Sequence, residues 1–395
     1  MKKLPCILIL FVLLSTNSVV YLRSPLEKKS RINLPIIIIP GSGGSRAYSE
    51  NLETKETNLI WFNLKYMMFP SYLSKEFKLD YNSSTKLLQD VKGFKILFPG
   101  WGDTNSVENL NDWKTSKTAY FQELINEMLE YSFYVKNKTL RAAPYDFRKS
   151  PLENTKFMKY FASLVEETFS NGNNQRVVII AHSLGTLVGL HFLYQMDEIW
   201  KMTYLHAFVA TSAPLGGSVK ALQAEISGSS FGMPRNSILY REIERSFSST
   251  AYLLPRPIVF ASTQILVQTT KRNYTSNDYF NLFRDINYMR GYEMFHKTKS
   301  YFSVNEALKG IKQIFCIHGI KVPTAKLLRY DSKFPNVEPE ILYGEGDGTV
   351  NINSLRNCRF WKSVSYMQIK KVNHNNILSD PSYISFIKKI TQVFV

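Results

Sequence analysis

Acidic residues are scarce in this sequence: 32 Asp and Glu stand against 49 Lys and Arg, which gives a formal net charge of +17. Such a balance suits nucleic acid, an anionic membrane surface or a merely solvated basic surface. The sequence contains no nucleic-acid-binding motif and no dense block of Lys and Arg. We therefore expect no nucleic-acid partner, and we favour a membrane surface or a solvated basic surface.

The apolar run at the N-terminus is too short to span a bilayer. Leu4 to Leu14 follows Lys2 and Lys3 and precedes small and polar residues, whereas a spanning helix needs ~20 apolar residues. This order of segments is typical of a secretory signal, which we place at residues 1–21; an uncleaved anchor is the alternative. The signal predicts entry into the secretory pathway, followed by residence in the lysosome or secretion.

Cysteine is also scarce, with three residues in the whole chain. Cys6 lies inside the predicted signal, which leaves Cys316 and Cys358. In an oxidising compartment such a pair favours a disulfide, and two buried free thiols are the alternative. Three Asn-x-Ser/Thr sequons agree with this compartment and predict glycosylation; they begin at Asn82, Asn137 and Asn273.

A serine lies in a small-residue turn between two apolar segments. The β-branched run Val177–Ile180 reads as a buried strand, and Thr186–Met196 can be helical. Between them, Ala181-His182-Ser183-Leu184-Gly185 fits the small-x-Ser-x-Gly pattern of a nucleophile elbow. The start of the helix supplies free N–H groups for a developing oxyanion. The pattern predicts Ser183 as a nucleophile; an ordinary strand–loop–helix joint is the alternative.

A second Gly-rich turn follows an earlier strand. The β-branched run Pro35–Ile39 leads into Pro40-Gly41-Ser42-Gly43-Gly44. The turn lacks the Gly-Lys-Ser/Thr ending of a nucleotide-binding loop. In a serine hydrolase such a loop supplies the second N–H of the oxyanion hole. We assign this role to the backbone of Ser42; a phosphate cradle or a simple tight turn is the alternative.

An acidic residue and a histidine follow late in the chain. Asp347 lies in the Gly-rich turn Gly344–Val350 after a strand, and His374 lies in a polar loop. The turn lacks the spaced acidic ligands of a calcium loop, and we expect no metal. The order Ser183, Asp347, His374 is the chain order of the α/β-hydrolase triad.

The segment Leu59–Pro70 is rich in Trp, Phe and Met. Composition alone favours a buried core helix. The same residue types suit a bilayer interface, and alongside the serine motif we predict membrane docking. The residues concerned are Trp61, Phe62, Leu64, Met67, Met68 and Phe69.

Strands and helices alternate over much of the chain, which favours an α/β class with a mostly parallel sheet and helices on both faces. The alternation fails from about Ser218 to Lys312. We interpret this region as an insertion that covers the site, part cap and part mobile lid. The alternation returns with a strand that begins at Gln313.

Several motifs together resemble the lecithin–cholesterol acyltransferase family, and within it most of all the lysosomal phospholipase A2 branch. The resemblance covers nearly the whole chain after residue 21. It rests on Ile36–Gly41, Ile60–Leu64, Pro99–Gly102, Pro144–Arg148, Ala181–Gly185, Ala213–Gly217, Asn273–Thr275 with Asp278-Tyr279, and Gly346–Asn351. It implies an α/β-hydrolase fold and an esterase that takes a fatty acyl chain from a glycerophospholipid and passes it to water or a lipid alcohol.

The resemblance also implies roles for individual residues. Ser183, Asp347 and His374 match the family's nucleophile, orienting acid and base, and the N–H groups of Ser42 and Leu184 match its oxyanion hole. Cys316 and Cys358 match its late disulfide, residues 61–69 its membrane-binding region, and residues around 225–245 its lid. The implied division of the chain is 1–21 signal, 22–47 start of the hydrolase core, 48–90 membrane-binding subdomain, 91–217 core, 218–312 cap and lid, and 313–395 core.

The chain departs from the family pattern at three places. Residues 42–90 contain no cysteine, where mammalian members carry a second pair, and Phe147 stands where a Trp is usual. Ser42 replaces an acidic residue of the lysosomal branch, which argues against inferring an acid pH optimum.

We expect no cofactor. The expected partners are phospholipid membranes or lipoprotein-like lipid surfaces and a lipid acyl acceptor. Two alternatives stay open: another secreted lipase or a cholesterol acyltransferase, and a catalytically silent lipid-binding protein on the same fold. The intact Ser183, Asp347 and His374 argue against the silent protein.

Overall fold

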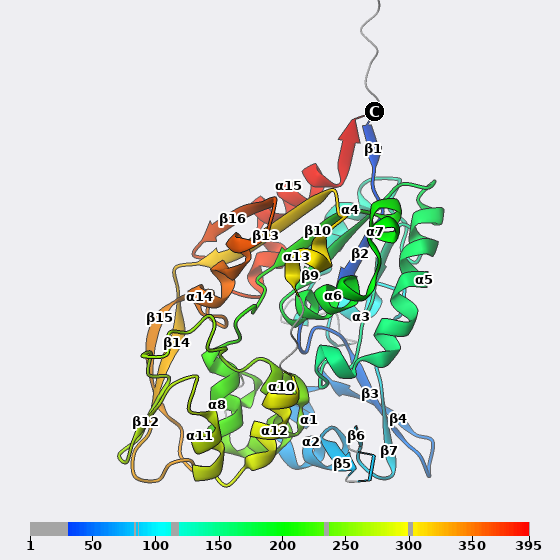
Figure 1. Ribbon diagram of the computed structural model, residues 1–395. Helices are drawn as coiled ribbons and strands as arrows, with labels where there is room; N and C mark the ends of the chain where they lie inside the picture. The colour runs from blue at the N-terminus through cyan, green and yellow to red at the C-terminus, as the bar shows by residue number, and fades with distance from the viewer. Residues whose placement is uncertain are drawn as a thin grey trace, which may run out of the picture.

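The computed structural model describes residues 31–82, 84–85, 87–111, 118–232, 237–298 and 303–394. The predicted signal, residues 1–21, lies outside them. Within these ranges, no helix combines the length and the apolar character needed to cross a membrane. Figure 1 shows the chain from blue to red; its first described strand, β1 (Arg31–Asn33), pairs antiparallel with its last, β17 (Gln392–Phe394).

The centre of the molecule is a six-stranded sheet in the order β16-β13-β10-β9-β2-β8, in which every neighbouring pair is parallel. All residues of β2, β9 and β10 are buried, as expected for a parallel sheet that is covered on both faces. The strands are β2 (Ile36–Ile39), β8 (Leu140–Ala142), β9 (Val177–His182), β10 (Leu205–Thr211), β13 (Gln313–Ile320) and β16 (Val364–Lys370).

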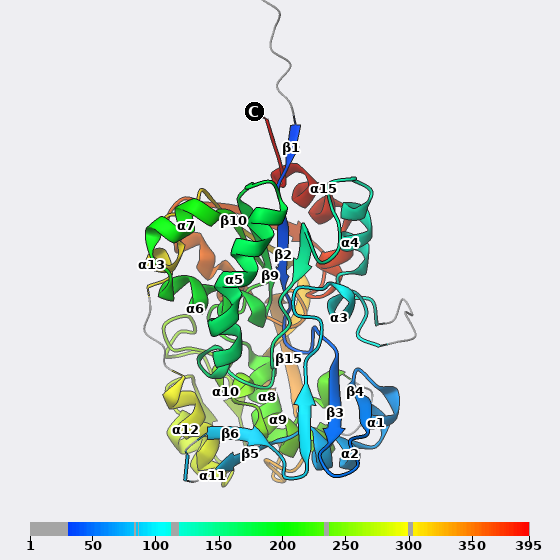
Figure 2. The same ribbon diagram turned by 90° about the vertical axis from the view of Figure 1, so that its right-hand side faces the viewer.

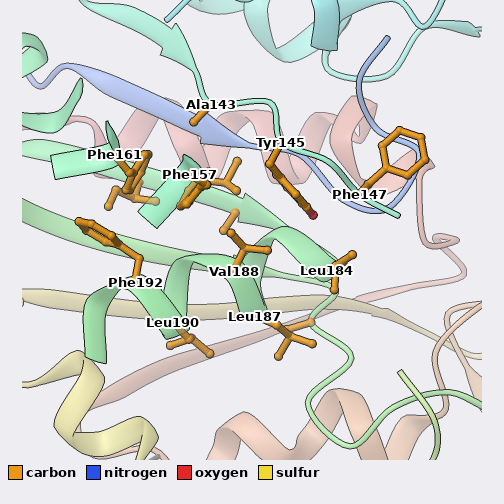
Figure 3. Packing of buried hydrophobic residues seen from close by; sticks show 14 of the residues in the cluster. Ala143, Tyr145, Phe147, Phe157, Phe161, Leu184, Leu187, Val188, Leu190 and Phe192 are labelled. Carbon is orange, nitrogen blue, oxygen red and sulfur yellow. The ribbon is translucent and has the colours of Figure 1, made fainter. Parts of the chain in front are cut away.

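Alternate residues of the central strands enter two separate hydrophobic clusters. Ile37 and Ile39 of β2 belong to one cluster, with α5 (Thr155–Asn171) and α6 (Leu184–Gln195). Figure 3 shows this packing, and the rings of Phe161 and Phe192 lie 4.9 Å apart between centroids. Ile36 and Ile38 belong to the other cluster, with α4 (Gln122–Leu129) and α15 (Pro381–Ile390). The two-residue period of the strand thus builds a helix–sheet–helix sandwich.

The strands that follow β2 in the sequence form a small antiparallel sheet in the order β4-β3-β7. It consists of β3 (Ala47–Asn51), β4 (Thr57–Trp61) and β7 (Phe94–Leu97). This sheet continues past residue 90 to Leu97, because β7 pairs with β3 rather than with the central sheet. The membrane-binding subdomain of residues 48–90 stays a prediction. Between β4 and β7 lie α1 (Leu64–Met68), α2 (Pro70–Glu76), β5 (Leu79–Asn82) and β6 (Leu87–Asp90).

The predicted cap region forms most of the remaining lower half of the molecule in Figure 1. Its helices are α8 (Val219–Ser227), α9 (Arg241–Ser246), α10 (Ser248–Tyr252), α11 (Tyr279–Asp285) and α12 (Met289–Lys297), followed by α13 (Val304–Leu308). Its strands β11 (Val267–Gln268) and β12 (Asn273–Tyr274) form one sheet with β14 (Val322–Arg329) and β15 (Glu340–Gly346). Residues 313–395, predicted as core, thus include two strands, β14 and β15, that pair with β11 and with each other rather than with the central sheet.

The predicted elements differ from the observed ones mainly at their ends. The strand before Ser183 extends to His182 and the helix after it begins at Leu184, because Ser183 alone makes the turn. The described residues also contain the short helices α3 (Asn105–Glu108), α7 (Glu198–Tyr204) and α14 (Ile352–Leu355) and the 3₁₀ segments η2 (Pro151–Glu153), η3 (Ser230–Gly232), η4 (Ser237–Tyr240), η5 (Arg356–Phe360) and η6 (Asn376–Ser379).

Candidate active site

Ser183 occupies the tight turn between β9 and α6. Its backbone angles are φ 52° and ψ −127°, a combination that non-glycine residues adopt only where the surrounding structure enforces it. The turn brings α6 so close to the end of β2 that a Cβ on Gly185 would lie 2.2 Å from the carbonyl oxygen of Pro40. The small residue of the motif is therefore required by the approach of two backbones.

The structure brings the three predicted catalytic residues into one hydrogen-bonded chain. His374 Nε2 lies 2.9 Å from Ser183 Oγ, and His374 Nδ1 lies 2.8 Å from Asp347 Oδ2. All three residues are buried, with exposed fractions of 9% for Ser183, 7% for His374 and 0% for Asp347. The imidazole of His374 thus lies between the hydroxyl of Ser183 and the carboxylate of Asp347.

The environment of Asp347 keeps its carboxylate charged. Burial acts to raise the pKa of Asp347, but the neighbouring His374 and hydrogen bonds to the carboxylate outweigh it and lower the pKa below its ordinary value. The second oxygen, Oδ1, accepts from the N–H groups of Thr349 (3.1 Å) and Val350 (2.8 Å). An ionised Asp347 holds the proton of His374 on Nδ1, which leaves Nε2 free to accept the proton of Ser183.

Both predicted oxyanion-hole residues lie beside the serine. Ser42 follows β2 and lines the same cavity as Ser183 and His374. Leu184 is the first residue of α6, so its N–H has no acceptor within the helix. Within the described part of the chain, neither N–H donates to another backbone or side-chain group. The role of these two N–H groups as an oxyanion hole stays a prediction.

Ser183 lines a cavity of about 460 Å³. Most of its wall is apolar, with Trp61, Phe147, Phe231 and Leu253 among the lining residues. Such a lining suits a hydrocarbon chain, while the serine and histidine supply polar groups at one point. Across the described residues, no group of His, Cys, Asp and Glu side chains has the arrangement of a metal site.

Two polar residues in this cavity wall, Glu244 and Lys220, were not predicted from the sequence. Glu244 is 2% exposed, and burial raises its pKa to about 7 even though the carboxylate accepts hydrogen bonds from Ser229 and Phe231. Burial also lowers the pKa of Lys220, against the charges of Glu244 and Asp347. Both residues lie in the insertion, where no motif marked them.

A second buried chain of hydrogen bonds runs behind the serine. The N–H of Gly41 donates to the hydroxyl of Tyr120 (3.0 Å), which is bonded in turn to Nδ1 of His182. His182 Nε2 lies 2.9 Å from the carbonyl oxygen of His374 and must donate to it. Burial and the nearby His374 lower the pKa of His182 to about 3, so this imidazole stays neutral. The chain ties together the three loops that carry Ser42, Ser183 and His374.

The sequence is similar to known proteins over most of its length. Residues 57–385 match the family described as Lecithin:cholesterol acyltransferase. The chain belongs to this family. It is 31% identical over 378 residues to the protein of Mus musculus named lysosomal phospholipase A and acyltransferase, covering 90% of each chain. It is also 31% identical over 340 residues to the phosphatidylcholine-sterol acyltransferase of Gallus gallus, covering 82% of this chain and 80% of that one.

Among solved structures, the chain is similar to the Tle4–Tli4 complex at 12% identity, covering 91% of this chain and 98% of that chain, with a TM-score of 0.46. The resemblance to the lecithin:cholesterol acyltransferase family is confirmed. The predicted α/β-hydrolase fold is confirmed for the central parallel sheet.

The structure contradicts the prediction of membrane docking for two residues, Trp61 and Met67. Trp61 is 6% exposed and Met67 is fully buried, and Trp61 Nε1 donates to the carbonyl of Gly43 (2.8 Å). Trp61 belongs to the inner end of β4, and Met67 lies on the inner face of the one-turn helix α1. Phe62 is half-buried against the core. The prediction of docking residues stays open for the exposed ones: Leu64 at 46%, Met68 at 39% and Phe69 at 52%.

The remaining predicted sites occupy separate parts of the family fold. Cys316 of β13 and Cys358 of η5 form a disulfide. Asn137 and Asn273 are exposed and Asn82 is half-buried; their glycosylation stays a prediction.

Phe147, where the family usually has Trp, packs against Trp61 with ring centroids 5.6 Å apart. Its neighbour Arg148 is 1% exposed and bonds Asp146 (2.9 Å) and Asp90 (2.6 Å). Phe147 thus contacts β4 of the small antiparallel sheet, and Arg148 holds the end of β6.

Proposed function

We propose that this protein is a serine phospholipase A and O-acyltransferase. It removes a fatty acyl chain from a glycerophospholipid through an acyl-enzyme and passes the chain to water or to a lipid alcohol, either ceramide-like or a sterol. The observation that carries the proposal is the series of hydrogen bonds from Ser183 Oγ to His374 Nε2 (2.9 Å) and from His374 Nδ1 to Asp347 (2.8 Å), in the wall of a largely apolar cavity.

In the first half-reaction, His374 takes the proton of Ser183 as the hydroxyl oxygen bonds to the ester carbonyl carbon. Asp347 holds the imidazole tautomer and stabilises the imidazolium. The N–H groups of Ser42 and Leu184 donate to the negative oxygen of the tetrahedral intermediate. When the ester bond breaks, His374 returns the proton to the leaving lysolipid oxygen, and the acyl chain stays on Ser183.

In the second half-reaction, water or a lipid alcohol takes the place of the lysolipid. His374 removes the proton of the incoming hydroxyl, whose oxygen bonds to the acyl carbon, and Ser183 is released with its proton restored. Relatives named for a lysosomal phospholipase and for a sterol acyltransferase are about equally similar to this chain. The family therefore supports acyl transfer, and the acceptor has to be identified by experiment.

Access to lipid requires the protein to dock on a phospholipid membrane or a lipoprotein-like surface. We assign docking to residues 48–97, through the exposed Leu64, Met68 and Phe69, helped by the net positive charge. Residues 218–312 serve as the cap, and the segment around 225–245 as the lid. The described part of that segment lies in the cavity wall through Phe231 and Glu244. The protein would act in the lysosome or outside the cell.

The acceptor can be identified with liposomes of phosphatidylcholine that contain ceramide, cholesterol or neither, at pH 5 and pH 7.4. Lysolipid and fatty acid in all three mixtures would establish the phospholipase. An acylated ceramide or a cholesterol ester would identify the preferred alcohol. Absence of lysolipid in every mixture, from a protein that binds the liposomes, would support the alternative of a silent lipid-binding protein.

A further inference from the structure

A second cavity, of about 220 Å³, lies between the β5–β6 hairpin, α10 and α12. Figure 2 shows β6 beside α12, at the same end of the molecule as α1 and α2. This cavity shares no lining residue with the cavity at Ser183. No motif in the sequence pointed to it, and the proposed reaction makes no use of it.

The chemical character of this cavity comes from Arg290. Its Nε and Nη2 atoms are buried, and neither has a hydrogen-bond partner. These two atoms form one edge of the guanidinium, the edge that binds both oxygens of a phosphate or carboxylate side by side. Burial of charged donors without an acceptor is costly, because they lose their water and gain nothing in exchange. The Nε–Nη2 edge of Arg290 therefore lacks the anion that would complete an ion pair.

A second cation lies next to the first. Lys297 follows Arg290 by seven residues on α12, which places both on one face of the helix. Both lie over the ring of Tyr81 from β5, with the Arg290 guanidinium 4.7 Å and Lys297 Nζ 5.6 Å from the centroid. The ring attracts positive charge to its face. It fixes the two cations in place without neutralising either of them.

The acidic residues of the cavity do not complete the pair. Glu153 Oε2 accepts from Ser150 Oγ (2.9 Å) and from Ser248 Oγ. Glu293 is exposed on α12. Among the described residues, no carboxylate lies within ion-pair distance of Arg290 or Lys297. Neither cation is thus neutralised by a described carboxylate. Because Nε and Nη2 of Arg290 have almost no accessible surface, a ligand reaches them only when the side chain turns toward the cavity.

We propose that this cavity is a binding site for the phosphate of an anionic membrane lipid, separate from the catalytic cavity. The guanidinium edge of Arg290 donates hydrogen bonds to two phosphate oxygens, and Lys297 adds a point charge. Leu87, 60% exposed, and Leu152, 36% exposed, lie at the opening and suit the glycerol and upper acyl chains. The position of the cavity favours a lipid over a free phosphate, since α1, which carries the exposed Leu64 and Met68, lies at the same end of the molecule.

The test compares three variants with a reference protein, called the unchanged chain in this comparison. All four proteins carry Ser183→Ala, so that the phospholipid of the vesicles is not hydrolysed. Arg290→Gln removes the edge and the charge, and Arg290→Lys keeps the charge without the edge. Arg284→Gln removes the same charge from the neighbouring α11, where Arg284 is exposed and bonded to Asp285. Binding is measured by co-sedimentation with vesicles of phosphatidylcholine, with and without phosphatidylglycerol. Thermal melts with sn-glycerol 3-phosphate form the soluble arm.

Phosphatidylglycerol should strengthen binding of the unchanged chain. Loss of any one surface cation near an anionic bilayer costs about fivefold, so this is the expected effect of Arg284→Gln. Loss of a bidentate charge-assisted contact costs about tenfold or more, so both Arg290 variants should lose more than the control. All variants should bind phosphatidylcholine vesicles alike. If an Arg290 variant melts far below the unchanged chain, Lys297→Gln takes its place, with a smaller expected loss.

Equal losses for Arg290→Gln and Arg284→Gln would overturn the site. A melting shift by sn-glycerol 3-phosphate that depends on Arg290, without any gain from phosphatidylglycerol, would overturn the assignment to a membrane lipid in favour of a soluble phosphate. Because every variant lacks the nucleophile, none of these outcomes depends on the proposed reaction.

Discussion

His182 Nε2 donates a hydrogen bond to the backbone carbonyl of His374, at 2.9 Å. The residue before Ser183 thus fixes the loop that carries His374. On its other side His182 is bonded to Tyr120, which accepts from Gly41 N–H at 3.0 Å. The geometry of three active-site loops therefore depends on one buried phenol and one neutral imidazole.

Tyr120→Phe should slow turnover without weakening substrate binding. The change leaves Gly41 N–H without its acceptor and His182 Nδ1 without its donor, and each unsatisfied buried group costs about 1–3 kcal/mol. We expect kcat on a soluble short-chain ester to fall roughly 10- to 100-fold, with KM within a factor of two or so. Tyr131→Phe, in the same region but outside this chain of bonds, is the matched control. Equal kinetics for the two variants would show that the bonds do not position the site.

Glu244 should make the folded protein more stable in acid. Its pKa is raised from 4.5 to about 7 by burial, so between these values the folded state binds more protons than the unfolded state, and stability falls as the pH rises. The full effect is on the order of 3 kcal/mol, from about 1.4 kcal/mol for each pKa unit. Chemical denaturation of the unchanged chain and of Glu244→Gln at pH 4.5, 6 and 7.5 measures it.

The Glu244→Gln variant should lose this part of the pH dependence, since an amide cannot ionise. Parallel pH profiles for the two proteins would show that Glu244 titrates like an exposed carboxyl. The result bears on location, because a site that is more stable in acid suits a lysosomal enzyme even though Ser42 replaces the acidic residue of that branch.

The exposed and buried residues of the 61–69 segment should respond to mutation in opposite ways. Leu64→Ser with Phe69→Ser removes exposed side chains, so the melting temperature should stay within a few degrees. Liposome binding should weaken by about 25 cal/mol for each Å² of apolar area that no longer enters the bilayer. Trp61→Ala should cost about 3–5 kcal/mol of stability, because its ring packs against Phe77, Phe147 and Phe231. Denaturation and co-sedimentation on the same preparations check both.

A stable Trp61→Ala variant with poor liposome binding would return this tryptophan to the membrane surface. Loss of folding in the Leu64/Phe69 double variant would show that these residues have a structural role instead.

The sequence predicted the features that depend on local patterns. The turn at Ser183 needs a buried strand, a small-residue motif and a helix within some twenty residues, and all three are visible in the chain. Asp347 and His374 were found from their order after Ser183 and from their Gly-rich or polar loops. The central sheet followed from the alternation of strands and helices.

Features that depend on distant packing were not predictable in this way. Trp61 and Met67 have the composition of both a membrane patch and a core, and only the fold around them separates the two. Tyr120 lies 62 residues before His182, with no local sign that the two meet. Glu244 and Arg290 belong to the insertion, where the regular alternation of strands and helices is lost. The pairing of β7 with β3 and the reach of β14 into the cap are likewise long-range.

The central claim is that Ser183 carries the acyl chain between donor and acceptor. Rapid-quench mass spectrometry during turnover of a phospholipid in mixed micelles tests it most directly. We expect a mass increase of one acyl group on the peptide that contains Ser183, lost on addition of an acceptor alcohol and absent from Ser183→Ala. His374→Ala should form this adduct slower by several orders of magnitude, on the order of 10⁶-fold in a well-studied protease. An acyl group on a different residue, or turnover by Ser183→Ala within tenfold of the unchanged chain, would contradict the account.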